Sequence, residues 1–139
     1  MDAFSPGLLS RLPREPEKVV VLKASRIGDL LCALPAIRAL RCALPNVELS
    51  LVTLPMLEDL ARCIPGVDRV IRFPGFPGIA EQLFRPEEAA QFFFEMQAEK
   101  FDLAIQLQGS GVYSNTFILM LGAKWTAGMV RRDDPSGLL

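Results

Sequence analysis

The clearest pattern of apolar and polar residues changes its period near Lys23. Before it, Val19–Leu22 is an unbroken apolar run of the kind found in a parallel strand that is buried on both faces. After it come a short polar turn and apolar residues that recur at steps of three and four, as in a helix with one buried face. These residues are Leu30, Leu34, Ile37, Leu40 and Leu44. A strand, a polar turn and a helix predict the first unit of a doubly wound α/β domain.

The rest of the chain alternates between the same two kinds of element. Further strands are predicted at 48–53, 69–73, 102–107 and 125–130, and further helices at 56–64, 86–100 and 115–121. This alternation favours a Rossmann-like, doubly wound, mainly parallel sheet of about five strands with flanking helices. We expect this domain over residues 18–130, preceded by a flexible lead-in (1–17) and followed by a tail or truncated linker (131–139).

Charge and motifs exclude several classes of function. The net charge of −1 provides no concentrated basic face for nucleic acid. No apolar run reaches the roughly 18 residues that a membrane-spanning helix needs, and residues 1–17 lack the apolar core of a secretory signal. Neither G-x-G-x-x-G nor G-x-x-x-x-G-K-[ST] occurs, so neither a dinucleotide site nor a P-loop is indicated.

The chain contains three cysteines and no histidine. Cys32, Cys42 and Cys63 are too widely spaced for a zinc motif, so we expect no metal site. We expect reduced thiols in a cytosolic protein, with Cys32 and Cys42 on or beside a buried helix face. Without histidine, a general base must be a carboxylate or a lysine, and Ser-His or Cys-His nucleophiles are excluded.

Four candidate site residues fall where the first strand turns into the first helix, at the edge where doubly wound domains bind ligands. They are Ser25, Arg26, Gly28 and Asp29. Free N–H groups at a helix start beside Arg26 would form an anion site for a sugar carboxylate or phosphate. The alternative is a tight turn with Arg26 facing solvent. Gly28 is expected to allow a positive φ or a close approach of the backbone to a ligand.

Asp29 has two interpretations. It is either a first-turn acid that complements the helix dipole, or a general base that the helix N-terminus keeps charged. Further along, Gln108 follows the strand 102–107, and Ser114 and Asn115 begin the next helix. Ser114 and Asn115 are expected either to cap that helix or to contact a substrate. Gln108 joins the candidate substrate contacts because it falls at the same edge of the sheet.

Two aromatic segments leave alternatives open. The loop 73–78 carries Phe73 and Phe76, which either stack on a sugar or pack on the core. In the helix 86–100, the predicted inward residues are Ala89, Ala90, Phe93 and Met96. Phe92 and Phe94 are then left over, and their apolar surface would meet the core, a second domain or a membrane.

Three patches of sequence resemble the ADP-heptose:lipopolysaccharide heptosyltransferase family, which is glycosyltransferase family 9. The first is Arg26–Leu40 with Pro45 after it, and it is similar to the family's first strand-helix unit. The second, Phe101–Gly109, resembles its fourth strand, and the third, Leu119–Gly128, resembles the next helix-to-strand step. The three patches occur in the family's order and cover most of residues 18–130.

The resemblance implies a function. Members are inverting glycosyltransferases of the GT-B fold, with an acceptor-binding first half and a second half that binds most of the ADP-sugar donor. This chain would supply the first half, with Asp29 as the catalytic base and no cofactor. The acceptor would be a lipopolysaccharide core or another glycan, and the protein would be cytoplasmic with peripheral contact at the inner membrane.

Departures and alternatives accompany the resemblance. Many members carry an acid where this chain has Gln106, which puts a charged role there in doubt, although an amide still hydrogen-bonds sugar hydroxyls. Alone, the chain is expected to be inactive, and its interdomain face could drive self-association. The alternative function is a non-catalytic α/β module that binds an anion or another ligand.

Overall fold

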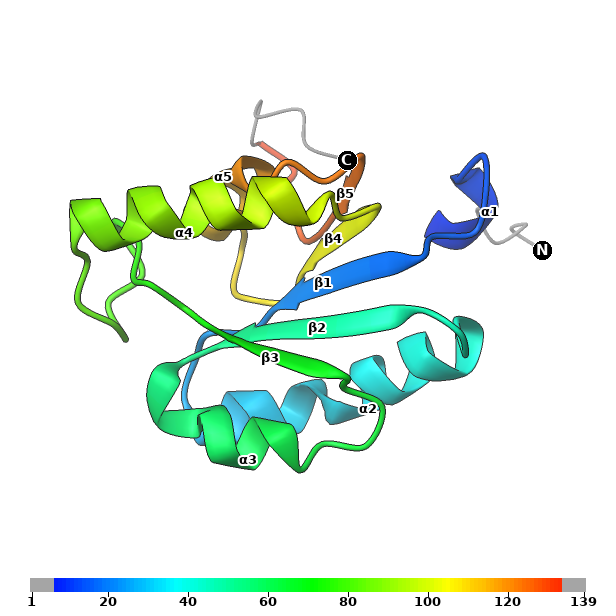
Figure 1. The fold of residues 1–139 in the computed structure, drawn as a ribbon, viewed down its shortest axis with the longest axis horizontal. Coiled ribbons are helices and arrows are strands. Elements are labelled where there is room, and N and C mark those ends of the chain that lie inside the picture. Colours follow the sequence, from blue (N-terminus) through cyan, green and yellow to red (C-terminus); the bar gives the residue numbers. More distant parts are fainter. Residues whose placement is uncertain (1–6, 134–139) are drawn as a thin grey trace.

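The computed structural model describes residues 7–133 and confirms the α/β fold (Figure 1). One five-stranded sheet has the order β3-β2-β1-β4-β5, and every neighbouring pair is parallel. The strands are β1 (Lys18–Leu22), β2 (Glu48–Thr53), β3 (Arg69–Arg72), β4 (Leu103–Gln106) and β5 (Trp125–Ala127). The helices are α1 (Leu8–Arg11), α2 (Ile27–Ala43), the 3₁₀ turn η1 (Pro55–Leu57), α3 (Glu58–Arg62), α4 (Pro86–Glu99) and α5 (Ser114–Met120).

The sheet lies between two layers of helices. In Figure 1, α2 and α3 cover one face, and α4 and α5 cover the other. The central strand β1 is therefore buried on both sides, and Val19–Leu22 is at most 1% exposed. A strand enclosed in this way has no polar face, which explains the unbroken apolar run that predicted it.

The lead-in contains a short helix that the sequence did not indicate. Its prolines suggested a flexible segment, but residues 8–11 form α1, and Leu8, Leu9 and Leu12 pack against the core. Residues 1–6 of the lead-in and 134–139 of the predicted tail lie outside the described residues. The sequence did not indicate α1 because Leu8, Leu9 and Leu12 are too few to show a helical period, whereas their packing depends on the core beside them.

Two element boundaries also differ from the prediction. The predicted helix 56–64 divides into η1 and α3. The last strand was predicted to reach Val130, but it ends at Ala127. Its backbone leaves the sheet there because the carbonyl of Met129 accepts hydrogen bonds from the side chains of Asn115 (3.0 Å) and Gln106 (3.5 Å). These contacts replace further pairing with β4.

The aromatic segments form one cluster within the core. Phe117 on α5 has its ring centroid 5.1 Å from that of Phe73, 5.5 Å from Phe76, 5.7 Å from Phe92 and 5.2 Å from Phe93. The loop 73–78 therefore packs on the core, which decides between the two alternatives for its aromatic rings.

The inward face of α4 differs at one position from the prediction. Ala89, Phe93 and Met96 are buried as predicted, but Phe92 is buried in place of Ala90. The aromatic cluster accommodates Phe92, because its ring meets both Phe93 and Phe117.

Polar surface residues also departed from expectation. Cys32 and Cys42 are exposed, as is Cys63, so α2 turns its thiols away from its buried face. Arg41, on the same helix, makes polar contacts with the segment before β3. Its guanidinium donates to the carbonyl of Gly66 and forms a 2.5 Å ion pair with Asp68. Arg41 therefore fixes the end of α2 to the turn before β3.

Asp102 ties the amino ends of two central strands together. Its carboxylate accepts hydrogen bonds from the N–H groups of Glu17 (2.9 Å) and Lys18 (3.0 Å) and from the ammonium of Lys124 (2.8 Å). Burial raises the pKa of Asp102, but the hydrogen bonds from Lys124, Glu17 and Lys18 outweigh it and lower the pKa from its usual 3.8 to about 2. The folded state therefore favours the charged carboxylate more than the unfolded chain does.

We expect Asp102→Asn to lower the free energy of unfolding by about 2 kcal/mol near neutral pH, with the loss shrinking in acid. A carboxylate with a lowered pKa stabilises the fold above its unfolded pKa, and this contribution disappears as the pH falls towards 2. Urea unfolding of both proteins at about pH 7, 5 and 3 measures the difference. A difference that stays constant across this range would contradict the assignment.

Candidate functional site

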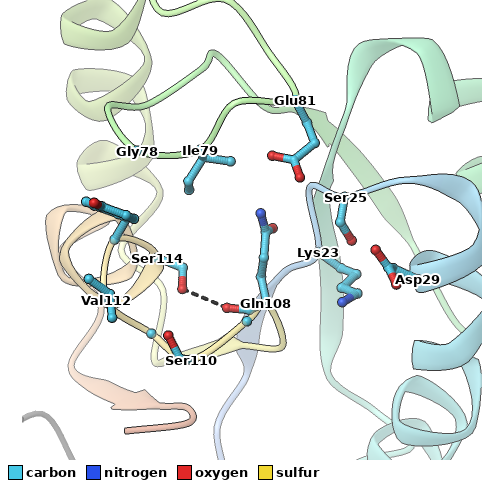
Figure 2. Close-up of a pocket in the computed structure, with 13 residues that line it drawn as sticks. Lys23, Ser25, Asp29, Gly78, Ile79, Glu81, Gln108, Ser110, Val112 and Ser114 are labelled. Atoms are coloured by element: carbon cyan, nitrogen blue, oxygen red, sulfur yellow. Dashed lines mark hydrogen bonds between the residues drawn. The ribbon is translucent and has the colours of Figure 1, made fainter. Parts of the chain in front are cut away.

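The candidate site lies where the strand order of the sheet reverses. The chain leaves β1 toward β2 and β3, and then returns to place β4 on the other side of β1. The crevice outside the carboxyl ends of such strands is the usual ligand site of doubly wound sheets. A cavity of about 480 Å³ opens at this position. The segment after β1 lines it together with the loops 78–81 and 108–114 (Figure 2).

Asp29 stands in the wall of this cavity, in the first turn of α2. Among residues 7–133, its carboxylate accepts no hydrogen bond and forms no ion pair, and its side chain is exposed. Helix α2 begins with the hydrogen bond from the N–H of Leu30 to the carbonyl of Arg26, with no side-chain cap. Asp29 is therefore not needed as a cap, and its oxygens remain available to a ligand. Its role as a base stays a prediction.

Ser25 contributes a buried hydroxyl to the same cavity. It is only 5% exposed, and its Oγ has no hydrogen-bond partner within residues 7–133. The hydroxyl of Ser50, in the middle of β2, is also buried without a partner among the described residues, but Ser50 does not line the cavity. A buried hydroxyl without a partner costs about 1–3 kcal/mol. A ligand in the cavity would remove that cost at Ser25 only.

Lys23 is a cavity residue that the sequence analysis did not select. Its backbone is fixed, because its N–H donates to the carbonyl of Val52 (2.9 Å) and its carbonyl accepts from the hydroxyl of Thr53 (3.0 Å). Among the described residues its ammonium forms no ion pair. Lys23 is the last residue before the turn, so its position after the apolar run was the signal that could have identified it.

Gln108 lines the cavity, but its amide already has protein partners. Its Oε1 accepts from the N–H of Ala24 (2.7 Å), and its Nε2 donates to the carbonyl of Ala24 (3.1 Å). This paired contact joins the turn after β1 to the end of β4. The structure therefore gives Gln108 a role in shaping the cavity, and its proposed substrate contact remains untested.

Ser114 and Asn115 do not cap α5, contrary to one of the two expectations. The N-cap residue is Tyr113, and no side chain caps the helix. The hydroxyl of Ser114 donates to the carbonyl of Gln108 (2.8 Å) at the edge of the cavity. Asn115 is 2% exposed and lies outside the cavity lining, where its Oδ1 accepts from Gln106 (2.9 Å). Ser114 therefore lies within reach of a ligand, whereas Asn115 belongs to an internal network.

Arg26 and Gly28 also lie outside the cavity lining. Arg26 instead lines a neighbouring groove of about 660 Å³, with Ile27, Met56 and Leu57. Gly28 has no positive φ, so that alternative was wrong, whereas the close approach of its backbone to a ligand stays a prediction. The reason is local, because Gly28 is already the second residue of α2. Of the seven candidates, the cavity brings together Ser25, Asp29, Gln108 and Ser114.

The loop after β3 supplies a second carboxylate that sequence reasoning missed. Glu81 lines the cavity, and it also lines the neighbouring groove together with Arg26. The loop carrying it lies against Tyr113, since a Cβ added at Gly78 would come within 2.3 Å of that ring. Gly78 also has a φ of +85°, which favours glycine. Glu81 follows β3 by nine residues, too far along the chain for strand periodicity to place it at the same edge.

Fold and cavity together define a Rossmann-like α/β domain with a candidate ligand site at its switch point. No protein-family model matches the sequence, and no curated protein matches it. Its fold is similar to that of the glycosyl transferase family 9 protein from Veillonella parvula, with a TM-score of 0.69, 21% identity, and coverage of 88% of this chain and 35% of that one.

Two solved structures from E. coli are also similar. For ADP-heptose lps heptosyltransferase II, the TM-score is 0.62 at 18% identity, covering 80% of this chain and 30% of that one. For heptosyltransferase WaaC with ADP, the TM-score is 0.60 at 23% identity, and the match covers 81% of this chain and 34% of that one. The resemblance read from the sequence is thus confirmed at the level of the fold. The chain spans about a third of the length of these proteins.

Two kinds of feature are absent from residues 7–133. None of the helices there has the length and apolar character to cross a membrane. No group of three or more Cys, Asp or Glu side chains is placed to hold a metal ion in that part of the chain.

Proposed function

We propose that this chain is the acceptor-side domain of an inverting glycosyltransferase. In this proposal a heptose or related sugar passes from an ADP-sugar to a lipopolysaccharide-core acceptor. The observation that carries it is the unpaired carboxylate of Asp29 in a cavity at the switch point of the sheet. Support also comes from the fold shared with solved glycosyltransferases and heptosyltransferases.

The proposed chemistry assigns one task to Asp29. Its carboxylate takes the proton of an acceptor hydroxyl as that oxygen bonds to the anomeric carbon of the donor sugar. The bond between that carbon and the phosphate oxygen breaks on the opposite side, and ADP leaves with the electron pair. Attack opposite the leaving group inverts the configuration. Ser25 and Ser114 would hydrogen-bond the acceptor, while Gln108 holds the cavity wall.

The donor and the cellular setting belong to the same proposal. WaaC has been solved with ADP and with ADP-2-deoxy-2-fluoro heptose. We propose that a nucleotide-sugar donor binds mainly to a second domain, with no cofactor. The protein would act in the cytoplasm, with peripheral contact at the inner membrane where a lipid-linked acceptor is found.

A transfer assay tests the proposal. The chain alone is compared with a fusion that joins it to the C-terminal half of a heptosyltransferase, with ADP-heptose and a lipopolysaccharide-core acceptor as substrates. We expect the fusion to transfer sugar and the chain alone to be inactive, because in this proposal the donor binds mainly to a second domain. Transfer by the chain alone at a rate near that of the fusion would contradict the proposed division of roles. Acceptor binding without transfer by a folded fusion would favour the non-catalytic ligand-binding module.

A further inference from the structure

We propose that Glu81 selects the acceptor, and that the cavity takes a sugar without acidic groups that presents hydroxyl or ammonium donors to Glu81. This assignment, which rests on the function proposed above, names the chemical class of the acceptor. The cavity carries a net negative charge. Its lining contains one ammonium, Lys23, and two carboxylates, Asp29 and Glu81, so its net charge is 1 − 2 = −1.

The carboxylates determine which groups a ligand can place beside them. An ionised carboxylate only accepts hydrogen bonds. Neither Asp29 nor Glu81 has an ion-pair partner among the described residues, so their oxygens are available to donors on a ligand. Sugar hydroxyls and ammonium groups are such donors, whereas the carboxylate of an acidic sugar would be repelled by both side chains.

Glu81 is held at the cavity by the loop before it. Ile79 is 6% exposed, and its N–H donates to the carbonyl of Phe76 (3.1 Å), which anchors the loop to the aromatic cluster. Gly78 packs on the ring of Tyr113 from the opposite wall. Glu81 follows this anchored segment by two residues, and Figure 2 shows its side chain beside the turn that carries Ser25. The backbone that leads to Glu81 is therefore anchored at the cavity.

Ser25 is independent evidence that this cavity receives a ligand. Its hydroxyl is buried and unpartnered within the described chain, and in Figure 2 it points to the same side as the Asp29 carboxylate. A hydroxyl both donates and accepts, so it suits a neutral sugar hydroxyl as a partner. Arg26, the cation expected to hold an acidic group, lines the neighbouring groove, which Glu81 also borders, and is outside the cavity lining. Lys23 is thus the only cation in the cavity lining.

Sugar binding to the 139-residue chain tests the selection directly. The probes are the methyl glycosides of glucose, galactose and mannose and the corresponding uronates, followed by ¹⁵N chemical shifts of the cavity residues. We expect at least one neutral glycoside to bind about tenfold or more tightly than its uronate. Glu81→Arg should reverse this preference, because it changes the cavity charge from −1 to +1.

Glu87→Arg is the matched control. Glu87 is exposed on α4, lies outside the cavity lining and has no ion-pair partner among residues 7–133, so the same charge change there should leave the preference unaltered. Tighter binding of uronates to the unmodified chain would contradict an acceptor without acidic groups. It would not contradict the proposed glycosyltransferase function. An unchanged preference in Glu81→Arg would overturn the role of Glu81. Absence of all six probes from the cavity would overturn both this assignment and the acceptor site proposed above.

Discussion

Replacement of Asp29 by asparagine is expected to lower the rate of sugar transfer by about a hundredfold or more in the fusion enzyme. This is the low end of what general acid–base catalysis contributes. Asparagine has nearly the same shape but cannot take the proton of the acceptor hydroxyl at neutral pH. The carboxylate has no hydrogen bond or ion pair with the described residues, so its loss breaks no contact within the domain. The measurement is the steady-state kcat and KM of both enzymes.

Two comparisons separate a base from a structural acid. Asp59→Asn removes an exposed acid from the first turn of α3, outside the cavity, and should leave turnover unchanged. In Asp29→Asn, kcat should fall while acceptor KM changes little, since the acceptor still meets Ser25 and Ser114. If kcat is unchanged and the fold is intact, Asp29 is only a first-turn acid, and the resemblance then informs about the fold alone.

Phe117→Ala is expected to cause the largest loss of stability, about 3–5 kcal/mol, which is typical of a buried phenylalanine reduced to alanine. Phe117 is completely buried and contacts four other aromatic rings. These rings come from α4 and from the loop that follows β3. Removing the central ring would leave a cavity. The surrounding segments are attached to different elements and cannot move inward to fill it. Urea unfolding followed by circular dichroism measures the change.

Phe94→Ala provides the control, because Phe94 is an aromatic residue of α4 that lies outside the buried cluster. Phe94 is 73% exposed, so its truncation should change the free energy of unfolding by no more than about 0.5 kcal/mol. Similar losses for Phe94→Ala and Phe117→Ala would show that the cluster is not the main support of this half of the core.

The aromatic cluster also connects stability to the site. Phe117 lies on α5, three residues after Ser114, and it packs against Phe76 in the loop that leads to Glu81. Both cavity loops therefore rest on the same core residues. A variant that loosens the cluster should disturb the cavity on two sides at once, which is why stability must be checked before any loss of sugar binding is interpreted.

Most of the fold could be predicted because its signals are local. The unbroken run Val19–Leu22 reflects burial on both faces of a parallel sheet, and the spacing of apolar residues in α2 reflects one buried face. Pro86 and the acids after it marked the start of α4 within one turn. The place of Asp29 followed from the same logic, because it begins the helix after the first strand.

The cavity itself depended on segments distant in sequence. Glu81 reaches the site through a loop that is anchored on aromatic residues. The side-chain amide of Gln108 is hydrogen-bonded to the backbone of Ala24, 84 residues away. The side chain of Asn115 lies in the interior, where it accepts a hydrogen bond from Gln106 and donates one to the carbonyl of Met129. None of these partners can be read from local spacing, since each contact exists only once the strands are placed side by side.

The sequence by itself determined the alternation of strands and helices, the α/β class, and the edge at which Asp29 lies. These properties depend on the period of apolar residues and on the chirality and connection rules of parallel sheets. Only the tertiary structure decided that Ser25, Asp29 and Glu81 share one cavity while Arg26 and Asn115 lie outside it. The physical reason is that side-chain direction and hydrogen-bond partners are set by packing between elements.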